Sequence, residues 1–220
     1  MEEGFSDEGR KKRYIDSYNA LFEEQADAHG IEGRRLWLPI DTLANQDVDA
    51  ALRISRRGFK DLEISREQMA GMCFSRVCDA SFALCQANVR HSITVGNVFV
   101  DNRPYYDTTP DSIAREVEKG YVHAAPAMAH SWITLENGVL LDFTLSYAIA
   151  RREGKRLPKL IKGIYRSDFP PVRGIRHIPM LLGPMYDLLV VTMPNDAGYE
   201  KGCDWVSMIL NLINGREFLG

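Results

Sequence analysis

The sequence predicts an α+β fold in which a helix-rich first half is followed by an antiparallel sheet. Residues 73–89 carry apolar side chains at steps of three and four, which is the pattern of a helix with one buried face. Residues 91–101 alternate and are rich in β-branched side chains, which is typical of a strand. Residues 129–144, AHSWITLENGVLLDFT, turn at an Asn-Gly pair, which indicates a β-hairpin.

The composition is that of one soluble domain covering residues 1–220. Hydrophobic residues make up 45% and charged residues 26% of the chain, which is ordinary for a globular protein. The formal net charge of −3 gives no attraction to nucleic acid or to an anionic membrane, so neither partner is expected. No run approaches the roughly 20 apolar residues that span a bilayer, and residues 1–14 lack the apolar core of a secretory signal. We therefore expect a cytoplasmic protein.

Residues 1–60 are expected to form a helical N-terminal extension of this domain. Apolar side chains recur at helical intervals over residues 11–29, which predicts an amphipathic helix. Residues 34–40 have the character of a short extended piece, and Asp41 is placed to cap a helix over roughly residues 42–56.

Residues 148–220 are expected to form a C-terminal extension packed on the same domain. An apolar run predicts a strand over residues 184–194, and an amphipathic run predicts a helix over residues 204–214. Residues 151–162 carry six Lys or Arg side chains. A solvated surface is the ordinary interpretation of such a run, and a surface that attracts an acidic partner is the alternative.

Four cysteines are present, and one of them differs from the others in its position. Neither the spacing of the cysteines nor the histidines that follow match a common zinc site, and a disulfide framework is not expected in a chain of this length without a signal. Cys78, Cys85 and Cys203 are interpreted as reduced, mostly buried thiols. Cys73 stands at the start of the predicted helix, where unpaired backbone N–H groups and the positive end of the helix dipole favour the reactive thiolate.

His130 begins the predicted hairpin, and Asp142 lies on its returning strand. A nucleophilic thiol needs a base within hydrogen-bond reach, and the base needs an orienting group on its other nitrogen. A strict two-residue turn would place Asp142 and His130 on opposite faces of the sheet. A three-residue loop over residues 136–138, with Gly138 in the left-handed conformation, would place Asp142 opposite Trp132 and diagonal to His130. We predict this loop because glycine adopts the left-handed conformation without strain.

Two segments resemble motifs of the transglutaminase-like superfamily. Residues 71–98 resemble the first motif, in which Gly-x-Cys opens a helix, a strand follows, and a glycine (here Gly96) stands about two dozen residues after the cysteine. Residues 130–144 resemble the second motif, in which His-Ala/Ser-Trp begins a strand and Asp-Pro-Thr ends the next. Phe143 replaces the proline here. The resemblance implies a papain-like core, with the catalytic helix packed on an antiparallel β-sheet.

The resemblance also implies roles for individual residues. Cys73 would be the nucleophile, His130 the general base and then acid, and Asp142 the group that orients the imidazole. The backbone N–H of Cys73 is a candidate oxyanion donor, and the side chains of Gln68 and Trp132 are further candidates for the oxyanion or substrate site. Gln68 has an alternative role, because Ser65 lies three residues before it in the pattern of a capping box.

The expected function is a thiol-dependent acyl transfer on an amide bond of a protein or peptide, through a thioester intermediate. Hydrolysis, as a peptidase or amidase, is favoured because water is always present, and protein-glutamine transglutaminase or deamidase activity is the alternative. Two other interpretations stay open: a binding module that retains the fold without the chemistry, and a metal site formed by Cys73 and His130. No cofactor is expected, and no acidic loop resembles a calcium site.

Overall fold

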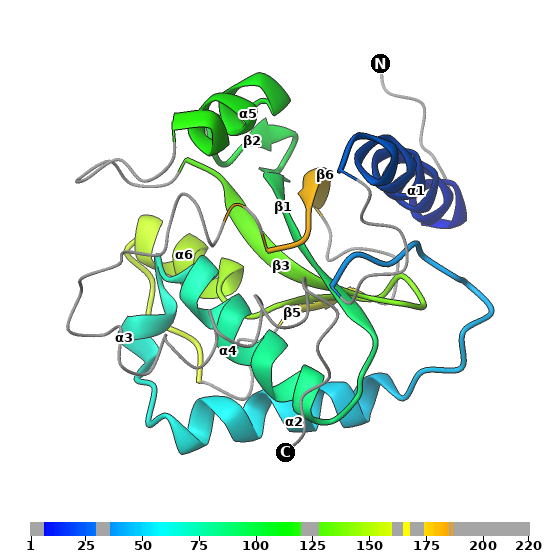
Figure 1. Ribbon diagram of the computed structural model, residues 1–220. Coiled ribbons are helices and arrows are strands. Elements are labelled where there is room, and N and C mark those ends of the chain that lie inside the picture. The colour runs from blue at the N-terminus through cyan, green and yellow to red at the C-terminus, as the bar shows by residue number, and fades with distance from the viewer. Residues whose placement is uncertain are drawn as a thin grey trace.

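The computed structural model describes residues 7–29, 36–119, 128–159, 165–167, 174–184 and 186 (Figure 1). Its helices are α1 (Asp7–His29), α2 (Val48–Asp61), α3 (Arg66–Met69), α4 (Cys73–Gln86), α5 (Pro110–Lys119) and α6 (Leu145–Arg152). Its strands are β1 (His91–Val100), β2 (Arg103–Pro104), β3 (His130–Leu135), β4 (Leu140–Asp142), β5 (Tyr165–Ser167) and β6 (Ile175–Leu182). These elements confirm the predicted α+β class, because helices accompany an antiparallel sheet.

Two predicted elements lie largely or wholly outside the residues that the structure describes. Nearly all of the strand predicted over residues 184–194, and the whole helix predicted over residues 204–214, lie outside the described residues. None of the helices within the described ranges has the length and apolar character needed to cross a membrane.

Strand β1 is the centre of the sheet. Its first part, residues 91–96, pairs with β3, and its later part, residues 94–100, pairs with β6. The order of the sheet is β2-β1-β3-β4-β5, and β6 pairs with β1 outside that path. All of these pairs are antiparallel. The long strand β1 therefore brings β3 and β6 together, although the two are far apart in the sequence.

Gly96 lies where β1, β3 and β6 meet. It pairs with His130 of β3 and, next to a shift in register between β1 and β6, with Pro179 of β6. A Cβ atom at this position would lie 2.0 Å from the carbonyl oxygen of Ile178 and 3.1 Å from the ring of Trp132. Only glycine fits, because real Cβ atoms do not approach a backbone oxygen so closely. Gly96 thereby allows β6 to approach β1 directly beside His130.

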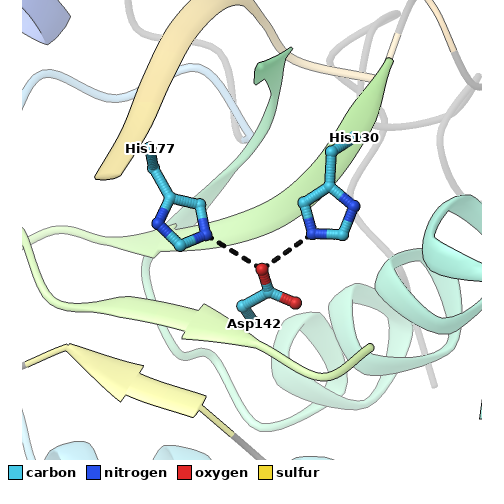
Figure 2. A group of neighbouring side chains, drawn as sticks. All are labelled: His130, Asp142 and His177. Atoms are coloured by element: carbon cyan, nitrogen blue, oxygen red, sulfur yellow. Dashed lines mark hydrogen bonds and ion pairs between the residues drawn. The ribbon is translucent and has the colours of Figure 1, made fainter. Parts of the chain in front are cut away.

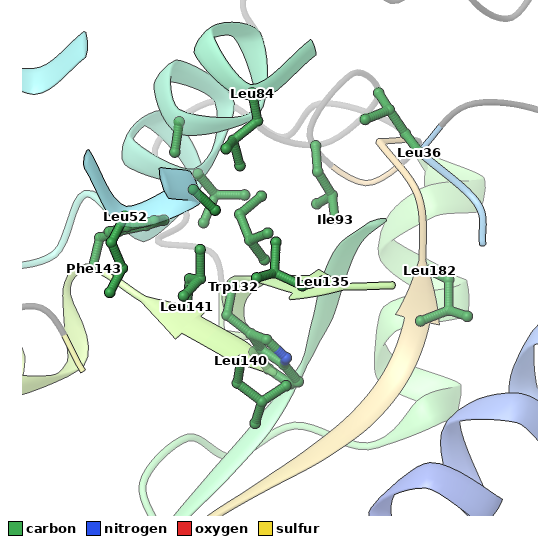
Figure 3. Packing of buried hydrophobic residues seen from close by; sticks show 14 of the residues in the cluster. Leu36, Leu52, Leu84, Ile93, Trp132, Leu135, Leu140, Leu141, Phe143 and Leu182 are labelled. Atoms are coloured by element: carbon green, nitrogen blue, oxygen red, sulfur yellow. The ribbon is translucent and has the colours of Figure 1, made fainter. Parts of the chain in front are cut away.

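The helices pack on this sheet through one large apolar core. Helix α4 contacts β3 and α2, whereas α1 contacts β6 (Figure 1). Figure 3 shows Leu84 of α4 pointing toward Ile93 and Leu135 of the sheet, and all three are fully buried. Burying each such side chain stabilises the fold by about 1.5–3 kcal/mol. Tyr14 and Tyr18 of α1 belong to the same cluster, so the N-terminal segment shares its core with the sheet.

The start of α2 differs from the helix predicted over residues 42–56. The helix begins after Asp47, whose carboxylate accepts a hydrogen bond from the backbone N–H of Ala50 at 2.8 Å. Asp41, the predicted cap, instead accepts the N–H of Leu43 at 2.9 Å in a turn. Both aspartates have the chemistry of a cap. The helix begins at the later one because the apolar face that packs on α4 starts only there.

Candidate active site

The hairpin of β3 and β4 closes through the predicted three-residue loop, which is thereby confirmed. The N–H of Leu135 donates to the carbonyl of Val139 at 2.9 Å, and the N–H of Gly138 donates to the carbonyl of Leu135 at 2.8 Å. Gly138 has a φ of 85°, in the left-handed region that favours glycine. The observed strand register, continued by one pair, sets Asp142 opposite Trp132.

His130 and Asp142 are consequently on one face of the sheet and in direct contact. Nε2 of His130 lies 2.7 Å from Oδ2 of Asp142, and both side chains are fully buried. Because a carboxylate only accepts, the ring nitrogen donates this hydrogen bond. The other oxygen, Oδ1, accepts the backbone N–H groups of Thr144 at 3.1 Å and Leu145 at 3.0 Å. These N–H groups belong to the start of α6, so the end of β4 and the beginning of α6 together fix the orientation of the carboxylate.

A second histidine, which sequence reasoning missed, binds the same carboxylate oxygen. Nε2 of His177 lies 2.9 Å from Oδ2 of Asp142 (Figure 2). His177 lies on β6 and pairs with Val98 of β1. A signal was present, since Ile175–Leu182 is largely apolar and His177 falls within it. Pro179 obscured the strand character of this segment, because proline is rare in paired strands.

His130, Asp142 and His177 form the one group among the described residues that has the composition of a metal site, with ligand atoms within 4.8 Å of one another. Two histidines and a carboxylate are a known ligand set for divalent metals. Here, however, both imidazoles lie at direct hydrogen-bond distances from one oxygen, 2.7 and 2.9 Å. The donors and the acceptor therefore satisfy one another, and the geometry fits a hydrogen-bonded group better than a metal centre.

Cys73 is the first residue of α4, as predicted, and lies next to this group. It is buried in a small apolar cluster that also contains Val95 and Ala129, the residue before His130. The helix start has no side-chain cap, so the first backbone N–H groups of α4 are not bound by the side chain of the capping residue. The Cys73 sulfur is close enough to act on the pKa of both His130 and Tyr106.

The charges at the site explain which histidine carries the proton. Burial opposes the charged ring of His130, but the charge and hydrogen bond of Asp142, followed by the influence of Cys73, outweigh burial and raise the pKa of His130 to about 10. Burial raises the pKa of the Asp142 carboxyl, and the two histidines more than reverse this effect and lower it below its usual range. For His177, burial dominates and lowers the pKa. These shifts favour the charged form of His130, the ionised form of Asp142 and the neutral form of His177.

His91 gives a useful comparison within the same sheet. Its ring is also buried, but its partners are the carbonyl of Val89 at 2.7 Å and the hydroxyl of Ser81 at 2.8 Å. Burial therefore prevails and lowers the pKa of His91 to about 4. The pKa of His130 is raised instead because its ring is bound by the carboxylate of Asp142.

Tyr106 is a further residue at the site that sequence reasoning missed. Its hydroxyl oxygen lies 3.1 Å from Nδ1 of His130, the ring nitrogen that does not face Asp142. The two rings are stacked, with centroids 5.3 Å apart and an interplanar angle of 16°. Tyr106 belongs to the segment between β2 and α5, where turn-forming residues gave no signal of a site.

The two tentative side chains, Gln68 and Trp132, both make hydrogen bonds within the fold. Gln68 completes the capping box at the start of α3: its Oε1 accepts the N–H of Ser65 at 2.7 Å, and the Ser65 hydroxyl accepts the N–H of Gln68 at 3.3 Å. Trp132 is fully buried, and its Nε1–H donates to the hydroxyl of Tyr14 at 3.2 Å. The indole N–H of Trp132 is thus already used within the fold, whereas its ring lies against His130, with centroids 6.1 Å apart. Gln68 takes the alternative role foreseen for it, since its amide is turned back to the chain before the helix.

The basic run over residues 151–162 is partly used inside the molecule. Arg152 lies 4.8 Å from the ring centroid of Tyr105 and donates to the Tyr105 carbonyl at 3.4 Å. Lys155 forms an exposed ion pair with Glu153 at 2.7 Å. Binding of an acidic partner by the other Lys and Arg side chains of residues 151–162 stays a prediction.

The arrangement combines a sulfur at a helix start, a charged imidazole and a buried carboxylate that orients it. These are the parts needed for nucleophilic attack by a thiol, with the imidazole able to give up and recover a proton. Comparison with known proteins finds no matching family model, no matching curated protein and no matching solved structure. The function must therefore be argued from the site itself.

Proposed function

We propose that the chain is a cysteine-dependent acyl-transfer enzyme with a papain-like core that acts on amide bonds, chiefly by hydrolysis. The single observation that carries the proposal is the buried hydrogen bond of 2.7 Å between His130 and Asp142. Burying an ionised carboxylate against an imidazolium is expensive for a protein. Such a pair next to a cysteine at a helix start is more readily explained by catalysis than by stability.

In the proposed reaction, the thiol of Cys73 passes its proton to Nδ1 of His130, and the sulfur attacks the carbonyl carbon of the amide. The new C–S bond forms while the carbonyl electron pair moves to the oxygen, and the backbone N–H of Cys73 donates to that oxygen. The returning electron pair breaks the C–N bond, and His130 gives its proton to the departing nitrogen, leaving a thioester. Water then attacks the thioester, its proton passes to His130, and the C–S bond breaks to release the acid.

The amide that is attacked, and the molecule that then accepts the acyl group from the thioester, distinguish the alternative activities. Water acting on a backbone amide gives a peptidase, and water acting on a glutamine side chain gives a deamidase. A primary amine gives a transglutaminase. We favour hydrolysis because water needs no binding site of its own. A binding module that keeps the fold without the chemistry is the competing proposal from another class.

Intact-mass spectrometry tests the proposal across several amide classes at once, so the natural substrate need not be identified first. The protein is incubated with defined peptides that contain backbone, asparagine and glutamine amides, each with and without methylamine. Cys73→Ala serves as the control, and the metal content of the protein is measured in parallel. We expect cleavage or conversion of at least one peptide by the wild type and none by Cys73→Ala.

Each outcome has a distinct meaning. A covalent adduct on the protein, peptide cleavage, conversion of glutamine to glutamate, or incorporation of methylamine supports acyl transfer and identifies the acceptor. Conversion that persists in Cys73→Ala contradicts the assignment of the nucleophile. A stoichiometric metal ion that is retained by Cys73→Ala and lost from His177→Phe would replace the proposal with a metal site.

A further inference from the structure

The position of Tyr106 relative to His130 carries an inference that rests on the proposed function and completes its oxyanion site. The hydroxyl oxygen of Tyr106 is 3.1 Å from Nδ1 of His130, and Nε2 of the same ring is committed to Asp142. Nδ1 is therefore the ring nitrogen that can exchange a proton with a thiol or a leaving group, and the Tyr106 hydroxyl lies beside it.

The backbone around Tyr106 is held by a buried asparagine on the central strand. Asn97 of β1 accepts the N–H of Tyr106 on its Oδ1 at 3.3 Å, and its Nδ2 donates to the carbonyls of Tyr106 at 2.9 Å and Thr108 at 3.2 Å. Asn97 is the residue after Gly96, which pairs with His130. The same short stretch of β1 thus positions both the imidazole and the tyrosine. Because its backbone is held in this way and its ring stacks on His130, the Tyr106 hydroxyl is preorganised and loses little conformational entropy in the reaction.

The hydroxyl hydrogen of Tyr106 is not needed for the hydrogen bond between Tyr106 and a charged His130. When His130 is charged, both of its ring nitrogens donate, so Nδ1–H donates to the oxygen of Tyr106. The hydrogen of the phenol must then point to another acceptor. Burial, and after it the charges of Cys73 and Asp142, raise the pKa of Tyr106, so the phenol keeps its hydrogen throughout the working pH range.

We propose that the Tyr106 hydroxyl is a catalytic hydrogen-bond donor that binds the carbonyl oxygen of the substrate as this oxygen becomes negative. The phenol forms no covalent bond and transfers no electron. It donates to the oxygen when sulfur adds to the carbonyl carbon and remains protonated when the adduct collapses. Two observations on the competing side chains support this choice: the amide of Gln68 is turned toward Ser65 in the capping box of α3, and the indole N–H of Trp132 already donates to Tyr14.

Two electrophiles that react with the same sulfur test this role. p-Nitrophenyl acetate acylates a thiol through a tetrahedral oxyanion, whereas iodoacetamide alkylates it by displacement without one. Tyr106→Phe keeps the ring stacked on His130 and removes only the hydroxyl. We expect the rate of acylation to fall about 10²–10³-fold, which is the typical effect of losing one oxyanion donor. Alkylation of Cys73 should change by less than about threefold, because the sulfur and the imidazole remain paired.

Tyr105→Phe is the matched control, since it removes a hydroxyl from the adjacent tyrosine, whose ring contacts Tyr106 at 5.0 Å between centroids. It should leave both rates near those of the wild type. An unchanged acylation rate in Tyr106→Phe overturns the inference, and so does an equal fall in both rates, which would mean that Tyr106 only positions His130. If wild-type Cys73 reacts with neither electrophile, the proposed function itself fails.

Discussion

Replacing Cys73 with alanine is expected to abolish acylation by p-nitrophenyl acetate and all amide turnover, while the protein stays folded. The sulfur is the proposed nucleophile, and no other described cysteine lies beside His130, because Cys78 and Cys85 lie further along α4. Alanine is the best helix former, so α4 should keep its start. The loss of one buried sulfur atom should cost about 1 kcal/mol, which corresponds to a fall of about 2–4 °C in the thermal midpoint for a chain of this size.

Cys78→Ala is the control for this experiment, because it makes the same atomic change on the same helix. It should retain the full acylation rate. Acylation is followed by release of p-nitrophenol and by intact mass, and stability by circular dichroism during heating. Retained acylation in Cys73→Ala, or a large fall of its thermal midpoint, would assign Cys73 to the core and not to chemistry.

Replacing Asp142 with asparagine is expected to have the largest effect on stability. The four hydrogen bonds to the carboxylate come from His130, His177 and two backbone N–H groups. If the amide oxygen of asparagine keeps the two backbone bonds, its NH₂ group faces the two imidazole donors. Because donors then oppose donors around a buried imidazolium, the free energy of unfolding should fall by about 3–5 kcal/mol. Asp47→Asn is the control and should be nearly neutral, since asparagine caps helices as well as aspartate does.

The pH dependence of stability should change in the same variant. The pKa of His130 is raised to about 10, so its contribution is fully present below the unfolded value of about 6.5 and is lost as the pH rises toward 10. The lowered pKa of Asp142 contributes stability that is present above about pH 3.9 and is lost in acid. The lowered pKa of His177 works against folding in acid. Urea unfolding from pH 6 to 10 should therefore show a decline in the wild type that is much weaker in Asp142→Asn, and parallel curves would contradict this account of the site.

The part of the site that depends on local sequence could be predicted. The start of α4 at Cys73 follows from helical periodicity, and the facing of His130 and Asp142 follows from the three-residue loop that Gly138 permits. Both relations involve residues joined by a helix or by a single turn. Periodicity and turn chemistry are local rules, so they suffice for such relations.

The rest of the site depends on contacts between distant segments. His177 reaches Asp142 only because β6 pairs with β1, which Gly96 permits by its close approach to Ile178. Tyr106 reaches His130 because Asn97 holds an irregular segment against β1. No periodic pattern specifies a pairing between strands that are far apart in sequence. A single polar side chain that holds a loop likewise leaves no repeating signal.

The proposed chemistry requires that the His130–Asp142 pair activates the sulfur of Cys73, and competitive alkylation measures this activation most directly. The protein is treated with limiting iodoacetamide at about pH 6, where ordinary thiols react slowly, and the labelled cysteines are identified by peptide mapping. Cys73 is buried, whereas Cys78 and Cys85 are partly exposed, so access alone would favour the other two. We predict that Cys73 is labelled first in the wild type and loses this advantage in Asp142→Asn. Slow and equal labelling of Cys73, Cys78 and Cys85 in the wild type would contradict the account.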